Sequence, residues 1–270
     1  MTISILGCGW LGLPLGKALL KAGHNVKGST TSPEKLATIH QAGIEPFLIK
    51  ITEDIVGERL NDFFNTDLVI LNIPPGRRKP NVEEQHPRQI RAVAQYLTEA
   101  EVGKLLFVSS TGVYPNLNKV VTEADETKAE RPSTRALIIA ENLLQLQNGF
   151  QTTILRMAGL VGGNRKAGRF LAGKKNVPNG DAPINLVHRD DCIAIIKEII
   201  RLEKWDGTYN ICADEHPTRR AFYIAQAYKE DLEPPTFTDD QTKVEYKIVS
   251  NQKIKTELNY IFQHPDPMQF

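Results

Sequence analysis

The sequence predicts an α/β fold built on a doubly wound, mostly parallel sheet. Through the first 160 residues, short apolar runs typical of buried strands alternate with amphipathic helical patterns. A glycine-rich turn separates the first apolar run from the first helical pattern. No internal repeat or low-complexity linker interrupts the chain, which favours a second lobe woven into the first.

The first half of the chain supplies most of the predicted sheet. Its strands are expected at TISIL (2–6), HNVKGST (24–30), EPFLIK (45–50), DLVILNI (67–73) and KLLFVSS (104–110). The helices between them are expected at 10–23, 32–43, 57–64 and 82–100. Gly23 closes the first helix, and Ser32 and Pro33 are start signals for the second, with Ser32 able to cap it.

The second half is less regular. It contains a predicted helix starting at PSTRALIIAE (132–141), a strand that runs into a glycine-rich turn (152–163), a strong amphipathic helix (190–202), a short strand (207–212), a helix (217–229), the strand-like KVEYKIVS (243–250) and a polar tail. Asp191, or Asp190 before it, is expected to cap the helix at 190–202.

Composition narrows the class of protein. The chain has 270 residues, 41% of them hydrophobic and 24% charged, as in a soluble globular protein. A net charge of +1 gives no reason to expect bulk attraction to nucleic acid or to an anionic membrane. No apolar run reaches the ~18 residues of a membrane span. Three widely spaced cysteines argue against a disulfide framework and favour a reducing cytoplasm. The six histidines show no metal-ligand spacing, so no metal is expected.

The turn GCGWLG (7–12) has the G-x-G-x-x-G pattern, directly after a strand and at the start of a helix. Gly7 permits a tight turn, Gly9 lets backbone approach a pyrophosphate, and Gly12 lets helix and strand pack closely. The alternative is a glycine-rich turn with no ligand. The residues expected to contact a dinucleotide here and after the fourth strand are Gly7, Cys8, Gly9, Trp10, Leu11, Gly12, Asn72, Ile73 and Pro74.

The end of the second strand bears on the choice of dinucleotide. An acidic residue about 20 residues beyond the glycines would bind the ribose 2′-hydroxyl of NAD. This chain has no carboxylate there before Glu34. The hydroxyls of Ser29, Thr30 and Thr31, with Lys35 nearby, can instead accept a 2′-phosphate, so NADP is favoured over NAD. The alternative is that these are only helix-start residues.

Six segments together indicate a family. They are GCGWLG (7–12), VSSTGVYP (108–115), RALIIAENLL (135–144), ILRMAGLVGGNR (154–165), NLVHRDD (185–191) and GTYNICADEHPTRRAFY (207–223). In this order the chain resembles the extended short-chain dehydrogenases/reductases, the NAD-dependent epimerase/dehydratase superfamily, and within it the atypical branch. The resemblance implies a Rossmann domain over 1–160 and a smaller substrate-binding lobe over 161–270, with parts of about 185–212 returning to the first sheet. It also implies a nucleotide-linked substrate.

The catalytic pair of that family is missing. Active members carry a Tyr and a Lys four residues apart on one helix, where the ammonium lowers the phenol pKa and the phenol exchanges a proton with substrate. Aligning Glu141 with the family's Glu puts Ser133 at the Tyr position and Leu137 at the Lys position. None of the seven tyrosines has a lysine four residues later. The remaining catalytic candidates are Ser110 and Tyr114, although Tyr114 usually shapes the pocket in this family.

Basic residues suggest an anionic substrate. Arg77 follows the fourth strand and Arg165 follows the sixth, so both are expected at strand carboxyl ends, where guanidinium can bind phosphate or carboxylate. The alternative is a pair of solvated loops. Arg156 lies within a strand and is expected to meet a carboxylate, backbone carbonyls or ligand. His188 matches the family's H-x-D-D segment and is expected to line the pocket.

Two functions remain open at this level. The first is an NAD(P)-dependent epimerase/dehydratase or reductase with a degenerate acid/base site, acting on an anionic or nucleotide-linked small molecule. The second is a non-catalytic NAD(P)-dependent sensor or regulatory binding protein. The resemblance further implies that the chain can form a homodimer through helices of its Rossmann domain.

Overall fold

The computed structural model describes residues 1–76, 81–128, 131–238 and 244–270. The chain divides into two compact units. Unit 1 contains residues 1–113, 127–156 and 199–208, and unit 2 contains residues 114–126, 157–198 and 209–270. The chain thus enters each unit three times. Among the helices in the described ranges, none combines the length and apolar character needed to cross a membrane.

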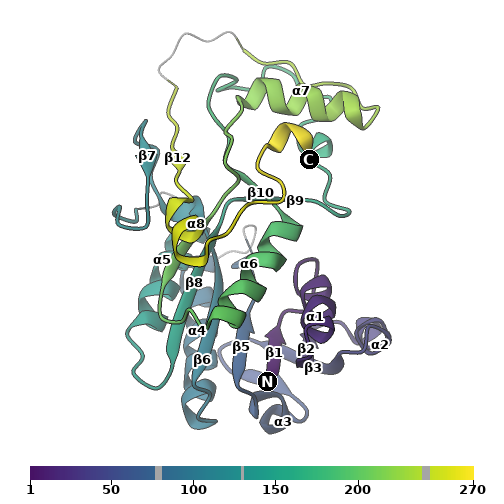
Figure 1. Ribbon diagram of the computed structural model, residues 1–270, viewed down its shortest axis with the longest axis vertical. Coiled ribbons are helices and arrows are strands. Elements are labelled where there is room, and N and C mark those ends of the chain that lie inside the picture. Colours follow the sequence, from purple (N-terminus) through teal and green to yellow (C-terminus); the bar gives the residue numbers. More distant parts are fainter. Residues whose placement is uncertain (77–80, 129–130, 239–243) are drawn as a thin grey trace. The chain divides into compact units, whose positions relative to one another are not determined.

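The central element is a sheet of eight strands (Figure 1). They are β1 (Thr2–Leu6), β2 (Asn25–Thr30), β3 (Glu45–Ile51), β4 (Ile55–Gly57), β5 (Leu68–Leu71), β6 (Lys104–Ser110), β8 (Gln151–Met157) and β11 (Thr208–Ile211). Their order across the sheet is β11-β8-β6-β5-β1-β2-β3-β4. Strand β1 pairs in parallel with β2 and β5, β2 with β3, and β5 with β6. The short β4 is antiparallel to its partner β3.

This strand order confirms the predicted α/β fold. The chain moves from β1 outward through β2 and β3, then returns to the other side of β1 with β5 and β6. Strand order therefore reverses between β1 and β5. In open parallel sheets this reversal point leaves a crevice at the carboxyl ends of the strands, where ligands bind. The loops after β1 and β5 border that position, and both belong to unit 1.

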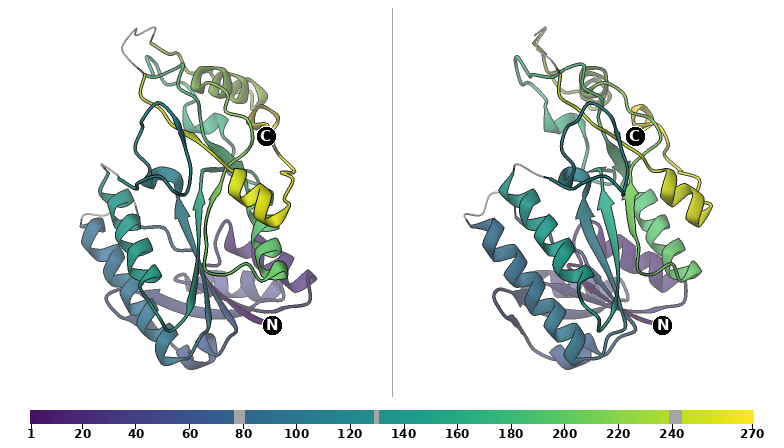
Figure 2. Two further views of the ribbon diagram at one scale, coloured as in Figure 1. Left: turned by 60° about the vertical axis from the view of Figure 1, so that its left-hand side comes forward. Right: turned by 90° about the vertical axis from the view of Figure 1, so that its left-hand side faces the viewer.

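The helices of unit 1 flank the sheet. They are α1 (Gly12–Lys21), the 3-10 turn η1 (Pro33–Lys35), α2 (Leu36–Gln41), α3 (Leu60–Phe64), α4 (Val82–Glu99), η2 (Thr111–Val113) and α5 (Pro132–Gln145). Helices α4 and α5 run side by side (Figure 2). Pro132 occupies the first helical position of α5, as its missing N–H and fixed φ favour. The buried positions Ala136, Ala140 and Leu144 follow at spacings of four, so one face of α5 packs inward.

Unit 2 contains short elements connected by loops. They are β7 (Val120–Val121), β9 (Gly159–Val161), η3 (Gly168–Phe170), β10 (Leu186–His188), α6 (Arg189–Leu202), whose last turn lies in unit 1, α7 (Arg219–Lys229), β12 (Ile248–Val249), α8 (Gln252–Leu258) and η4 (Pro267–Gln269). The expected strand at 243–250 is reduced to β12, which pairs with β7. The expected polar tail was wrong in part, because it contains α8, which buries Ile254 and Leu258.

Candidate cofactor site

The glycine-rich turn after β1 has no room for side chains at two of its three glycines. Gly7 has a φ of +103°, and a Cβ there would lie 2.4 Å from the carbonyl oxygen of Asn72. A Cβ on Gly12 would lie 2.4 Å from the carbonyl oxygen of Gly7. Both approaches are far shorter than a van der Waals contact. Gly7 and Gly12 are therefore required by the backbone geometry of the turn itself.

Gly9 differs from its two neighbours in the motif. No described atom lies within 4 Å of a Cβ built on Gly9, so the space beside its backbone is open. The first turn of α1 follows directly and carries no acidic side chain that would compete for its N–H groups. An open backbone face at a helix N-terminus suits the pyrophosphate of a dinucleotide. The residues present therefore fit that group.

Ser29, at the carboxyl end of β2, holds the turn in place. Its side-chain Oγ accepts a hydrogen bond from the backbone N–H of Gly7 at 3.0 Å, and its carbonyl oxygen accepts one from Cys8 N–H at 2.8 Å. Ser29 is only 3% exposed. Its hydroxyl was expected to be one of those that can accept a 2′-phosphate, whereas its contact with the glycine-rich turn was not expected. The available signal was its place at the end of the strand next to β1, since neighbouring parallel strands end at the same sheet edge.

Other expected cofactor residues support the turn or line it. The Asn72 side chain donates to the Gly7 carbonyl at 3.1 Å, so the loops after β1 and β5 are joined directly. The Cys8 thiol packs against Gly28, and burial raises its pKa to about 12, so it stays protonated and weakly reactive. Leu11 is buried, and Trp10 and Ile73 are half-buried, while Pro74 is exposed.

The end of β2 carries hydroxyls and a cation. The Thr30 side chain accepts a hydrogen bond from Ser32 N–H at 3.1 Å. Ser32 occupies the N-cap position of η1, as expected, but its side chain makes no capping hydrogen bond. The expected side-chain cap was therefore wrong. Thr31 and Lys35 are exposed. The strand end thus presents an alcohol and an ammonium group, without a carboxylate before Glu34.

The two positions of the missing catalytic pair lie on α5. Ser133 is in the first turn of the helix and Leu137 is one turn later, and both are buried. Leu137 packs as an apolar core residue where a lysine would need a partner for its charge. The N-terminal turn of α5 is also close to η2, because a Cβ on Gly112 would lie 2.9 Å from the methyl group of Thr134.

Comparison with known proteins assigns the family. A family model described as NAD(P)H-binding matches residues 7–200, from the glycine-rich turn into α6. The chain belongs to the NAD(P)H-binding family. A dinucleotide is therefore its cofactor, and the matched residues begin in the turn after β1.

This NAD(P)H-binding protein is also similar to a curated relative and to solved structures that contain NAD. Protein YeeZ of Escherichia coli K12 is 33% identical over 98% of this chain and 97% of its own length. A short-chain dehydrogenase/reductase superfamily protein from Agrobacterium tumefaciens with bound NAD has a TM-score of 0.79 and 20% identity, covering 97% and 93% of the two chains. UDP-glucuronic acid 4-epimerase from Bacillus cereus, in complex with UDP-glucuronic acid and NAD, has a TM-score of 0.79 and 18% identity, covering 100% and 96%. The fold is that of the NAD-dependent epimerases and dehydratases.

The two catalytic candidates differ in their surroundings. Ser110 ends β6, is partly exposed, and accepts a hydrogen bond from Gly112 N–H at 3.1 Å. Tyr114 is 2% exposed, and its hydroxyl donates to Asn210 Oδ1 at 2.8 Å. The hydroxyl of Tyr114 is thus engaged within unit 2. Its contacts favour a structural role, while a role in proton transfer stays a prediction.

Arg156 meets a carboxylate, one of the alternatives expected for it. Its Nη2 lies 2.7 Å from Oε2 of Glu141, its Nε lies 3.1 Å from the same oxygen, and both side chains are buried in unit 1. Ser109 donates to the other carboxylate oxygen. Glu141 on α5 thus joins β6 and β8. This pairing explains the buried charge without a ligand, and substrate binding by Arg156 stays a prediction.

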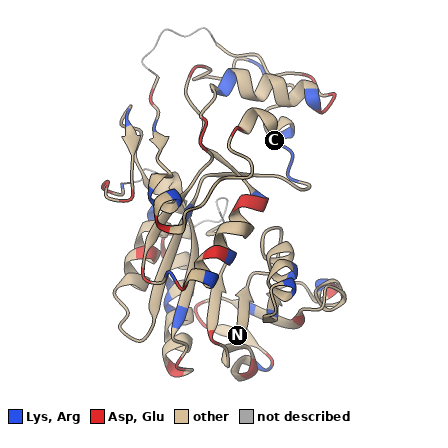
Figure 3. Ribbon diagram, viewed as in Figure 1, with Lys and Arg blue, Asp and Glu red and all other residues tan. Residues whose placement is uncertain are grey.

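The other basic candidates are less defined. Arg77 lies outside the described residues. Arg165 has an exposed side chain, and its backbone closes a tight turn with Gly162 through hydrogen bonds of 3.1 and 3.2 Å. Further along the same loop, Lys175 pairs with Glu233 at 2.5 Å. Among the described residues, Lys and Arg are interspersed with Asp and Glu (Figure 3), so any anion specificity is local.

The start of α6 differs from expectation. Asp190 donates its backbone N–H to Nδ1 of His188 at 3.3 Å, so the imidazole takes the capping position expected of an aspartate. Asp191 is fully buried and accepts hydrogen bonds from Tyr260 Oη, Gln263 N–H and His264 N–H, at 2.7, 2.7 and 3.0 Å. The expected aspartate cap was therefore wrong, because Asp191 holds residues 260–264 instead.

Proposed function

We propose that this protein binds NADP(H) in preference to NAD(H) and acts as an NADP(H)-dependent binding protein rather than a conventional short-chain dehydrogenase. The cofactor preference rests on the end of β2. Thr31 and Lys35 are exposed there, and no carboxylate precedes Glu34 to bind a ribose 2′-hydroxyl. A 2′-phosphate would bring a double negative charge to the Lys35 ammonium, a pairing that NAD lacks.

Tryptophan fluorescence provides the test of cofactor preference. The chain has two tryptophans, and Trp10 lies in the glycine-rich turn itself. In a Trp205→Phe background, NADPH and NADH are titrated against the remaining indole. We expect tighter binding of NADPH, and a loss of about tenfold in NADPH affinity in Lys35→Ala, about 1.4 kcal/mol.

Two controls sharpen this test. Lys35→Ala leaves NADH affinity unchanged if the ammonium binds the 2′-phosphate. Lys21→Ala removes another exposed ammonium group, in the last turn of α1 and so away from the glycine-rich turn. It is expected to leave the NADPH and NADH affinities unchanged. Equal losses of NADPH and NADH affinity in Lys35→Ala would reject the 2′-phosphate assignment.

The buried Ser133 and Leu137 support a binding function. A positioned general acid or base is worth ~10²–10⁴ in rate, and this chain has Ser133 and Leu137 where the family carries the pair. Tyr114, the nearest phenol in the sequence to Ser110, is buried and donates its hydroxyl proton to Asn210. Conventional proton transfer by this family's mechanism therefore lacks its donor here.

A second candidate is an oxidoreductase or epimerase acting on an anionic or nucleotide-linked small molecule. It is favoured by the partly exposed Ser110 at the carboxyl end of β6 and by the basic residues between Arg165 and Lys175. Structural neighbours solved with UDP-sugars support the same substrate class. The cofactor would carry the hydride, and the hydroxyl of Ser110 would hold the substrate oxygen.

A substrate screen separates the two functions. Nicotinamide absorbance is followed with nucleotide sugars and small carboxylates, using protein that binds NADPH in the fluorescence titration. Turnover that falls at least about 100-fold in Ser110→Ala, with cofactor affinity kept, would establish the oxidoreductase and reject the binding protein. NADPH binding that changes affinity for a screened ligand, with no turnover, is the result expected of a binding protein.

A further inference from the structure

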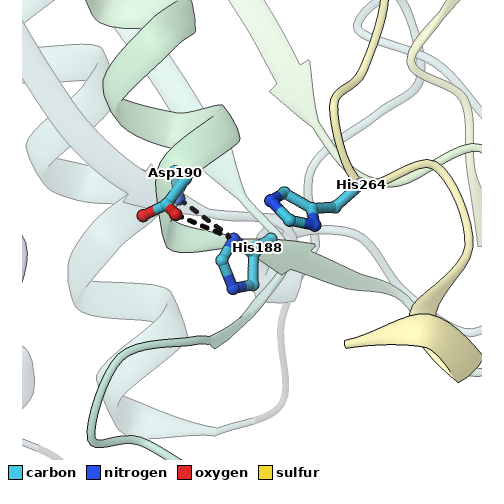
Figure 4. Close-up of side chains that lie close together, drawn as sticks. All are labelled: His188, Asp190 and His264. Carbon is cyan, nitrogen blue, oxygen red and sulfur yellow. Dashed lines mark hydrogen bonds and ion pairs between the residues drawn. The ribbon is translucent and has the colours of Figure 1, made fainter.

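Three possible metal ligands lie together in unit 2, in the segments around residues 188 and 264. His188 ends β10, Asp190 lies in the first turn of α6, and His264 lies in the segment after α8 (Figure 4). One ligand atom from each residue lies within 4.8 Å of the other two. Nδ1 of His188 is 3.7 Å from Oδ2 of Asp190. The spacing of the histidines in the sequence gave no sign of this group, because the fold brings the segments together.

We propose that His188, Asp190 and His264 bind a divalent transition-metal ion of the zinc class. Two imidazoles and a carboxylate are a ligand set that such ions prefer, and they leave at least one position for water. In a tetrahedral site with bonds of about 2.1 Å, ligand atoms are separated by about 3.4 Å. Shifts of about 1 Å in side-chain positions would close the present arrangement around an ion.

The surroundings orient His188 toward this group. Its Nε2 faces Gly162, where a Cβ would lie only 2.6 Å away, so the glycine gives the ring its space. Its Nδ1 faces Asp190 and accepts a hydrogen bond of 3.3 Å, a long contact that an ion could replace.

Asp191 positions the third ligand. It accepts hydrogen bonds from the N–H groups of both Gln263 and His264, and from the hydroxyl of Tyr260. These contacts hold the backbone of the C-terminal segment beside the start of α6. The ligand set is therefore largely organised before an ion arrives, which reduces the ordering cost of binding.

The same group has an alternative explanation as an aromatic cluster. The His188 and His264 rings have centroids 3.9 Å apart, and Phe270 lies 5.5 Å from His188 and 6.2 Å from His264. Arg189 also lies near, with its Nε 3.6 Å from Oδ1 of Asp190, and its charge opposes a cation. A useful variant must therefore keep the ring packing while it removes the ligand atoms.

His264→Phe meets that requirement, and His188→Asn keeps a capping acceptor for the N–H of Asp190. Protein freed of metal by chelator dialysis is titrated calorimetrically with ZnCl₂. We expect about one Zn²⁺ per chain for the wild type, and at least about a tenfold loss of affinity in His264→Phe, His188→Asn and Asp190→Asn. His40→Gln, which replaces an exposed histidine on α2, keeps wild-type binding.

Thermal unfolding provides the second readout. Zn²⁺ is expected to raise the Tm of the wild type and of His40→Gln, and to leave that of His264→Phe unchanged, because only a bound ion stabilises the folded state. Far-UV circular dichroism checks that each variant is folded. Absence of Zn²⁺ binding by the wild type, or equal binding by a folded His264→Phe, would overturn the proposal. Neither measurement involves a dinucleotide, so the result is independent of the proposed function.

Discussion

The side-chain oxygen of Ser29 accepts a hydrogen bond from the backbone N–H of Gly7 at 3.0 Å. The contact joins the end of β2 to the glycine-rich turn after β1, and the Ser29 carbonyl binds the next N–H, that of Cys8. A turn that must present its backbone to a pyrophosphate is thereby fixed from the neighbouring strand before any ligand binds. Such preorganisation lowers the cost of binding.

Ser29→Ala is expected to weaken dinucleotide binding and to destabilise the fold. The variant leaves the Gly7 N–H without its acceptor in a partly buried place, which costs about 1–3 kcal/mol. Chemical denaturation measures the loss of stability, and calorimetry measures the loss of NADPH affinity. Ser32→Ala is the matched control, since the Ser32 side chain makes no capping hydrogen bond. A Ser29→Ala variant with wild-type stability and affinity would show that this hydrogen bond is dispensable.

Substitutions of the glycines in the turn are expected to distinguish effects on folding stability from effects on ligand affinity. Gly9→Ala has open space for its methyl group, so it keeps the wild-type Tm while NADPH affinity falls at least about tenfold. Gly12→Ala instead drives a Cβ against the Gly7 carbonyl and costs about 1–3 kcal/mol of stability. Gly103→Ala also meets open space, away from the turn, and changes neither quantity. Unchanged affinity in a folded Gly9→Ala would exclude the backbone of Gly9 from the ligand site.

Removing one partner of the buried pair of Arg156 and Glu141 is expected to lower the free energy of unfolding more than removing both partners. Glu141→Leu leaves a buried guanidinium without its carboxylate, which costs about 3–5 kcal/mol, and the added Arg156→Met recovers much of that loss. Urea denaturation of the two single variants and the double variant completes a cycle. The partly exposed pair of Arg135 and Glu83 is the control, where Glu83→Gln is expected to change stability much less than Glu141→Leu, because solvent screens the charges. Additive losses in the cycle would contradict the coupling.

Acid is expected to destabilise unit 2 partly through His216. Burial lowers the pKa of His216 below its ordinary value, although the carbonyl of Ile184, 3.1 Å from Nδ1, opposes the shift. The unfolded chain therefore takes up the proton first. The contribution of His216 is fully present above the unfolded pKa of about 6.5 and is lost as the pH falls through the folded pKa. Tm measured with EDTA at a series of pH values should fall less steeply for His216→Gln. An identical slope would reject this assignment.

Local signals in the sequence predicted most of unit 1. The alternating apolar runs corresponded to β1, β2, β3, β5 and β6, and Pro132 marked the start of α5. Short elements such as β4, β7 and β10 were missed, because two or three residues are too few for a period to be visible. Helix α8 was missed for a different reason: only its two buried residues, Ile254 and Leu258, distinguish it from a polar tail.

The sequence by itself indicated the family, the glycine-rich turn and the absence of a Tyr and Lys four residues apart, because each depends on residue types and their spacing along the chain. Only the tertiary structure decided the partners of isolated polar residues. It paired Arg156 with Glu141, engaged Ser29 with the turn, and placed His264 beside His188. The physical reason is that a strand or helix follows from local spacing, whereas a buried charge or imidazole takes the partner that a distant segment brings to it.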